Sequence, residues 1–133
     1  MKQIEHQIQA AFVQWADWHE GRHPALRLGF AVPNGGLRHK ATAGKLKAEG
    51  VKAGVPDWIL PVRAAGYSGL AIEFKSQGGK LSDDQKRYRN LMIAAGWKTV
   101  VCFSVDEAIA VTKQYLAKLT QTQVDLIFRA MSI

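Results

Sequence analysis

Residues 54–75 read GVPDWILPVRAAGYSGLAIEFK and contain two apolar segments, each with charge at one end. Asp57 follows a proline at the start of the first segment, and Glu73 and Lys75 close the second. Side chains two residues apart on a strand point to the same face, so Glu73 and Lys75 are predicted to share one. The opposite face of that strand is apolar and is expected to enter the core through Leu70, Ile72 and Phe74.

The first segment also alternates as a strand does, and the connection at residues 63–69 contains two glycines that suit a reversal of the chain. The two strands are therefore predicted to be antiparallel, with Asp57 near Glu73. Converging carboxylates repel each other unless a cation lies between them, and their oxygens suit Mg²⁺ or Mn²⁺. An adjacent ammonium, that of Lys75, would stabilise charge on a phosphate or help to deprotonate and position a water. The stretch thus predicts a site for metal-assisted phosphodiester hydrolysis.

Composition favours one intracellular domain. A chain of 133 residues fits a single domain spanning residues 1–133, which can bury roughly two-thirds of its unfolded surface. The single cysteine, Cys102, lies in an apolar run and is expected to be a small buried hydrophobe in a reducing cytoplasm. The first ten residues lack the apolar region of a signal peptide, and no stretch approaches the roughly 18 apolar residues of a membrane helix. A soluble protein with no membrane partner is expected.

The charge balance favours a polyanionic partner. The chain has 18 Lys and Arg against 11 Asp and Glu, a formal net charge of +7. The basic residues concentrate in residues 38–52 and 80–89, on either side of the proposed site in the chain, as a surface that follows DNA phosphates would require. A solvated helix face remains the alternative for each one. The predicted DNA-binding residues in these clusters are Arg38, Lys45, Lys47, Lys52 and Lys80.

The N-terminal half is predicted to contain two helices around one strand. Apolar residues recur at helical spacing from Lys2 to about His19. Glu5 borders the buried stripe of that helix, which makes it a candidate third carboxylate; an ordinary first-turn glutamate favoured by the helix dipole is an equal alternative. Residues 26–32 alternate as a strand and stop at a Pro-Asn-Gly-Gly turn, and residues 39–49 have a helical composition.

The C-terminal half is predicted to add a helix, a strand and a second helix. Ser82 to Gln85 forms a capping-box pattern, so Gln85 either caps its own helix, the safer interpretation, or reaches the site to orient the water or a phosphate. A strand at residues 98–103 precedes another helix, and the apolar tail at residues 121–133 either closes the core or makes a subunit contact. The order α-β-α-β-β-α-β-α predicts an α/β fold, a small mixed sheet flanked by helices.

The order of these motifs resembles the PD-(D/E)xK nuclease superfamily and, within it, the VRR-NUC (virus-type replication-repair nuclease) domain. The likeness covers nearly the whole chain. Each motif is weak alone, but their order is fairly specific. The motifs are the early helix with Glu5, the Pro33-Asn34-Gly35-Gly36 turn, the basic segment with Arg38 and Lys47, Gly54-Val55-Pro56-Asp57, Ile72-Glu73-Phe74-Lys75, and Leu81-Ser82 followed by Gln85.

The resemblance implies a restriction-endonuclease-like fold and a set of site residues. Glu5, Asp57, Glu73 and the backbone carbonyl of Phe74 would bind Mg²⁺ or Mn²⁺, while Lys75 assists the water. It also raises Gln85 to a candidate catalytic residue and places Asn34, in the turn, beside the DNA. Family members include standalone phage and bacterial proteins that act as dimers on branched DNA, so a standalone homodimer is expected.

The main hypothesis is a metal-dependent DNA endonuclease, structure-selective, with a four-way (Holliday) junction as candidate substrate in replication, recombination or repair. A restriction-type duplex endonuclease on the same fold ranks lower, because nothing in so short a chain marks a separate recognition domain. A non-catalytic nucleic-acid-binding module is the third hypothesis. The intact set of Asp57, Glu73 and Lys75 argues against it, since such a module has no need to keep two acids beside phosphate.

Overall fold

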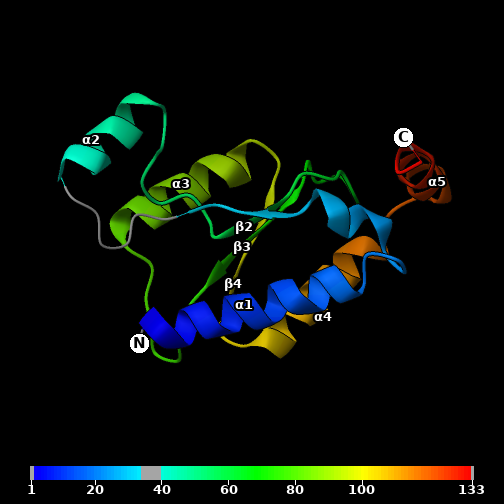
Figure 1. Cartoon of the computed structure of the whole chain (residues 1–133), viewed down its shortest axis with the longest axis horizontal. Helices are drawn as coiled ribbons and strands as arrows, with labels where there is room; N and C mark the ends of the chain where they lie inside the picture. The colour runs from blue at the N-terminus through cyan, green and yellow to red at the C-terminus, as the bar shows by residue number, and fades with distance from the viewer. Residues whose placement is uncertain (1, 34–39, 133) are drawn as a thin grey trace.

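The computed structural model describes residues 2–33 and 40–132. Its elements follow the predicted order, with a short 3₁₀ helix and a last α-helix added (Figure 1). They are α1 (Lys2–Trp18), η1 (Pro24–Leu28), β1 (Phe30–Ala31), α2 (Lys40–Ala48), β2 (Trp58–Leu60), β3 (Leu70–Phe74), α3 (Asp83–Ala94), β4 (Lys98–Cys102), α4 (Val105–Leu116) and α5 (Gln121–Ala130).

The sheet has the strand order β1-β2-β3-β4 and is mixed. β2 pairs antiparallel with β3, as predicted, and also antiparallel with β1, and Pro61 follows directly where β2 ends. β3 pairs parallel with β4, because α3 carries the chain back to the starting end of β3. Asp57, just before β2, and the carboxyl end of β3 therefore lie at the same end of the strands.

Helices cover both faces of the sheet (Figure 1). α1 and α4 pack together on one face and contact β3, while α3 packs on the other face against β4. Phe12 of α1 meets Trp58 of β2 edge-on, with ring centroids 4.9 Å apart, and lies 5.6 Å from Phe74 of β3. All five residues of β3 are consequently buried, including Glu73, so the charged face of this strand is covered as well as the apolar one.

The strand predicted at residues 26–32 is wrong over its first half. Pro24 opens the 3₁₀ helix η1 and fixes the backbone for a turn, and Leu26 is buried within it. Only Phe30 and Ala31 pair with β2. At Gly29 the backbone passes against the indole ring of Trp58, where a Cβ atom would overlap the ring. Alternation of apolar residues alone did not reveal this turn.

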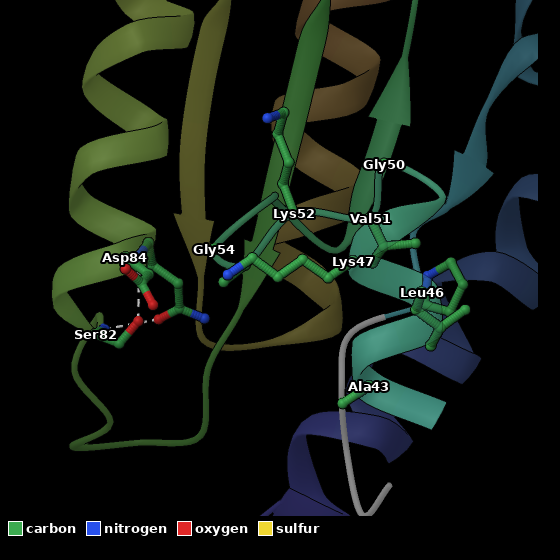
Figure 2. Close-up of a pocket in the computed structure, with 12 residues that line it drawn as sticks. Ala43, Leu46, Lys47, Gly50, Val51, Lys52, Gly54, Ser82 and Asp84 are labelled. Atoms are coloured by element: carbon green, nitrogen blue, oxygen red, sulfur yellow. Dashed lines mark hydrogen bonds between the residues drawn. The ribbon is translucent and has the colours of Figure 1, made fainter. Parts of the chain in front are cut away.

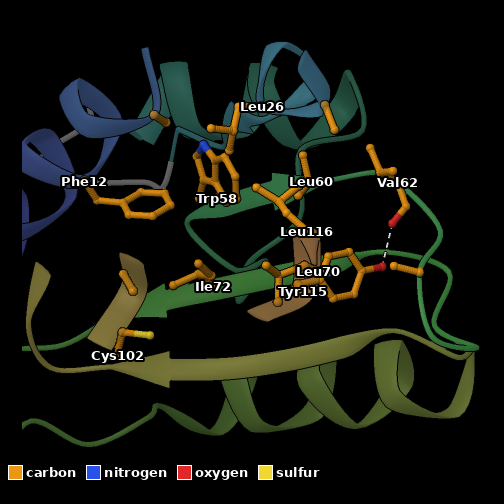
Figure 3. Close-up of a cluster of buried hydrophobic side chains, with 14 of the residues drawn as sticks. Phe12, Leu26, Trp58, Leu60, Val62, Leu70, Ile72, Cys102, Tyr115 and Leu116 are labelled. Carbon is orange, nitrogen blue, oxygen red and sulfur yellow. Dashed lines mark hydrogen bonds between the residues drawn. The ribbon is translucent and has the colours of Figure 1, made fainter. Parts of the chain in front are cut away.

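The C-terminal helices cover the core at the end of the strands opposite to Asp57. Tyr115 of α4 donates a hydrogen bond of 2.5 Å to the carbonyl of Val62, across the chain connection that follows β2 (Figure 3). α5 packs against η1 and contributes Ile127 to the core, while Leu126 and Phe128 stay largely exposed. Cys102 is buried, as predicted, and burial raises the pKa of its thiol to about 11. Within the described ranges, no helix has the length and apolar character needed to cross a membrane.

Candidate active site

Glu73 and Lys75 stand together at the carboxyl end of β3. Glu73 is only 6% exposed, whereas Lys75, just beyond the strand, is half-buried. The amide of Lys75 donates a hydrogen bond of 3.0 Å to the carbonyl of Cys102, so the extended pairing with β4 continues past Phe74. The backbone thus stays extended from Glu73 to Lys75, the conformation in which residues two apart lie on one face.

Asp57 reaches the same point from the start of β2. Its Oδ2 accepts a hydrogen bond of 2.7 Å from the amide of Phe74, which lies between Glu73 and Lys75. The carboxylate is also hydrogen-bonded to the side chain of Glu73. The structure therefore brings together the two acids that the sequence placed 16 residues apart.

Glu5 approaches from the first turn of α1. Its Oε2 accepts hydrogen bonds of 3.3 Å from both the amide and the hydroxyl of Ser76, a residue 71 positions away that is 3% exposed. Its charge also contributes to the raised pKa of Glu73. Glu5 thus lies next to the two acids, with its carboxylate turned toward Ser76. Sequence reasoning missed Ser76, and the only signal for it was its place directly after Lys75.

The environment of Glu73 strongly disfavours its charged form. Burial raises its pKa from 4.5 to about 9, with the hydrogen bond and charge of Asp57 and the charge of Glu5 acting in the same direction. Lys75 opposes this shift but does not cancel it. Without a cation, Glu73 consequently holds a proton at neutral pH, because its pKa is about 9.

The acids fit a hard divalent cation by their chemistry. The buried carboxylate of Glu73 and the half-buried carboxylate of Asp57 are in hydrogen-bond contact and would both ionise beside such a cation, and carboxylate oxygens are the ligands that Mg²⁺ and Mn²⁺ prefer. Across residues 2–33 and 40–132, no three His, Cys, Asp or Glu side chains are already arranged to hold a metal ion. The pair of Asp57 and Glu73 is therefore the preformed part of the site, and Glu5 is at its border.

Gln85 caps its own helix and also reaches the acids. Its Oε1 accepts from the amide of Ser82 and its own amide donates to the Ser82 hydroxyl, which completes the predicted capping box at the start of α3. Its Nε2 at the same time donates a hydrogen bond of 3.2 Å to Oε2 of Glu73. The cap thus fixes the side chain that orients the acid.

Behind this contact lies a small cavity of about 10 Å³, room for roughly one water molecule, with Glu73, Gln85, Arg89 and Thr99 among its lining residues. Arg89 donates a hydrogen bond of 3.3 Å to the carbonyl of Thr99. Its Nε and the Thr99 hydroxyl are both buried and have no hydrogen-bond partner among the atoms that the structure describes. The sequence had indicated Arg89 only as part of a basic cluster.

The predicted DNA-binding residues divide into three groups. Lys47 and Lys52 lie in and after α2 and line a pocket that also borders Gln85 (Figure 2). Lys45 and Lys80 are exposed and lie outside that lining. Asn34 and Arg38 fall outside the described residues. In the described part of the chain, none of these lysines takes part in an ion pair.

Gly54 sets how closely the chain before Asp57 approaches α3. Its φ of +84° is in the left-handed region, and a Cβ atom would overlap the backbone of Asp84 in α3. Gly50 has a φ of +101°, but a Cβ atom added there would meet no atom of the described residues within 4 Å. Alanine at either glycine would strain the backbone, but only alanine at position 54 would also overlap α3. The two positions can therefore be compared to separate the two effects.

We expect Gly54→Ala to lower the free energy of unfolding by about 2–4 kcal/mol, and Gly50→Ala by about 1–2 kcal/mol, because only Gly54 adds an overlap to the strain. Urea denaturation of both variants measures this difference. Equal losses in the free energy of unfolding would show that the close approach to α3 is not the reason why position 54 requires glycine.

Comparison with known proteins was consistent with these observations. The VRR-NUC domain model matches residues 3–106, from α1 to the start of α4. A solved VRR_NUC domain protein superposes with a TM-score of 0.70 at 26% sequence identity, over 86% of this chain and 89% of its own. No curated protein matches the sequence. The predicted family and fold class are both confirmed.

Proposed function

Since the chain belongs to the VRR-NUC family of nuclease domains, we propose that it is an endonuclease that hydrolyses DNA phosphodiester bonds with Mg²⁺ or Mn²⁺. The observation that carries this proposal is the contact of the half-buried Asp57 with the buried Glu73, beside Lys75. A fold maintained only for stability gains nothing from a buried acid whose pKa is about 9. A cation would make the arrangement favourable.

Asp57 and Glu73 would hold the cation, with Glu5 and the carbonyl of Phe74 completing the set. When bound there, a divalent cation supplies charge stabilisation for the phosphate and lowers the pKa of water. The Glu5 carboxylate is held by two bonds of 3.3 Å to Ser76, so it could exchange Ser76 for the cation at little cost.

Lys75 would act on the phosphate and the water. Its ammonium is close enough to lower the pKa of Glu73 and is half-buried, so water screens it less than a surface lysine. In this position it would stabilise the charge that develops on the phosphate as a water oxygen attacks phosphorus and the bridging P–O bond breaks. Gln85 would keep the Glu73 carboxylate in one orientation during this step.

The basic residues around α2 would hold the DNA. Lys47 and Lys52 lie on the same side of the molecule as Gln85, and their charges are not neutralised by ion pairs within the described ranges. Lys45, Lys80, Asn34 and Arg38 are assigned to DNA binding from the sequence. A branched substrate such as a four-way junction, and a homodimer, are part of the proposal because of the family resemblance.

The proposal is tested by incubating the protein with labelled four-way junction, flap, nicked and linear duplex DNA in Mg²⁺, Mn²⁺ or EDTA. We expect cleavage in either metal, none in EDTA, and the highest rate on a branched substrate. Cleavage of linear duplex at one defined sequence would favour a restriction-type enzyme. The absence of metal-dependent cleavage on every substrate would leave only a binding module.

Replacing Lys47 by alanine should weaken binding to all DNA substrates and reduce the slope of log K against log salt by about 0.7–0.9, because one phosphate contact is lost. Fluorescence anisotropy between about 50 and 200 mM salt measures this slope. Lys118→Ala removes the same charge just beyond α4, far from α2, and serves as the control (Figure 1). An unchanged slope for Lys47→Ala would mean that the DNA lies on another face.

A further inference from the structure

A pocket of about 690 Å³ opens between α2 and the start of α3, directly beside the candidate active site (Figure 2). Figure 2 shows Lys47 extending from α2 toward Gly54, with Ser82 and Asp84 on the opposite wall. Gly54 and Gln85 line both this pocket and the small cavity at Glu73. The pocket therefore shares two wall residues with the cavity beside Glu73.

The walls combine an apolar surface with positive charge. Among the lining residues that the structure describes, the one acid, Asp84, is paired with Arg87 at 2.5 Å. Lys47 and Lys52 form no ion pair with any residue that the structure describes. A ligand fits this combination if it has a flat or apolar part and also carries negative charge. The apolar part of the lining comes from Pro33, Ala43, Leu46, Val51 and Ala53.

Most polar groups in the walls are already engaged. The Ser82 hydroxyl accepts from the amide of Gln85, whose side chain bonds both Ser82 and Glu73. These groups cap α3 and orient Glu73, so their directions are fixed, and the donors they keep are the Ser82 hydroxyl hydrogen and one Gln85 amide hydrogen. The pocket is thus suited to contact a base mainly through its faces, with little selection of its identity.

We propose that this pocket binds one unpaired nucleotide of the DNA next to the phosphate that is cleaved. The volume lies in the range of small-molecule sites and exceeds what one nucleotide needs. A paired base is stacked on both faces and is costly to remove from the duplex, whereas an unpaired base enters at lower cost. The two lysines would hold its phosphate and the apolar wall its base.

This inference rests on the proposed nuclease function and narrows its substrates. DNA with unpaired or easily opened nucleotides at a branch point would be cut in preference to continuous duplex, whatever the base at that position. Selectivity for structure would then come from the cost of opening a base pair, and the enzyme would need no separate recognition domain.

A matched pair of variants on one helix tests the proposal. Ala43 lines the pocket, whereas Ala48 is exposed on α2 outside it, and the two are five residues apart on different faces. We expect Ala43→Phe to fill the pocket and to lower affinity for a flap substrate by about tenfold, with Ala48→Phe within about twofold of the parent. Circular dichroism confirms that both variants keep the fold.

Binding is measured in EDTA by anisotropy, so the result does not depend on cleavage. Each nucleotide at the branch point is replaced in turn by an abasic site, which keeps the phosphate and removes the base. We expect one abasic position to weaken binding of the parent about tenfold and to have almost no further effect in Ala43→Phe, because both changes remove the same contact.

The pocket assignment would be overturned if the abasic site and Ala43→Phe had additive effects on binding. It would also be overturned if no abasic position weakened binding of the parent. Equal losses in Ala43→Phe and Ala48→Phe would do the same. A protein that binds with this pattern but cleaves no DNA in Mg²⁺ or Mn²⁺ would keep the nucleotide pocket and refute the nuclease proposal. The two failures are therefore distinguishable.

Discussion

Changing Asp57 to asparagine or Glu73 to glutamine is expected to lower kcat by at least about a thousandfold, while the affinity for DNA in EDTA stays within about twofold. Each amide keeps the shape of the acid but removes a negative oxygen from the proposed cation site. Asp57→Asn also retains an oxygen that can accept the hydrogen bond from Phe74, so the end of β3 stays in place. Alanine at either position should give the same loss of cleavage, with a larger cost in stability for Asp57.

Single-turnover cleavage of the best substrate in Mg²⁺ measures this loss, and anisotropy measures binding. Asp17→Asn removes an exposed acid from α1, the helix that also carries Glu5, and serves as the control. Full activity in either active-site variant would remove that residue from the site. A loss that Mn²⁺ restores in part would support a role in holding the cation.

Glu73→Gln should also stabilise the metal-free protein, because it removes an acid that is costly to ionise in this place. The pKa of Glu73 is raised from 4.5 to about 9, so its contribution to stability is intact below pH 4.5 and is lost as the pH rises toward 9. The gain in the free energy of unfolding should grow across this window in EDTA. A constant difference between variant and parent would indicate that the acid is not buried as described.

Changing Lys75 to methionine is expected to lower kcat by about a hundredfold to a thousandfold, since the ammonium would act on charge that appears only in the transition state. Methionine retains most of the apolar length of lysine, and Lys75 is half-buried, so packing should change little. KM and the binding of DNA in EDTA should change by less than about threefold.

The control for Lys75 is Lys80→Met, which removes a charge from an exposed position five residues along the chain. Lys80 is assigned to DNA binding, so this variant should show weaker binding at high salt with kcat retained. If Lys75→Met shows the same pattern, Lys75 is a binding residue. Alkaline pH should not restore its cleavage, because the missing group is a cation and not only a base.

Local patterns in the sequence were sufficient for most of the elements. Alternation of side chains predicted β3 and the shared face of Glu73 and Lys75, and a capping box marked the start of α3. The interpretation failed at residues 26–28, where a 3₁₀ turn carries apolar residues at the same spacing as a strand. The reason is that Pro24 and the approach of Gly29 to Trp58, rather than the hydrophobic period, decide the backbone there.

The sequence by itself determined the chemistry of the candidate site: which acids, which lysine, and the family to which their order belongs. Only the tertiary structure decided that Glu5 reaches Ser76, that Gln85 holds Glu73 while it caps its helix, and that a pocket borders both. It also decided the raised pKa of Glu73. The period of a strand fixes which side a residue faces, but burial and long-range contacts depend on what every other element places over that side.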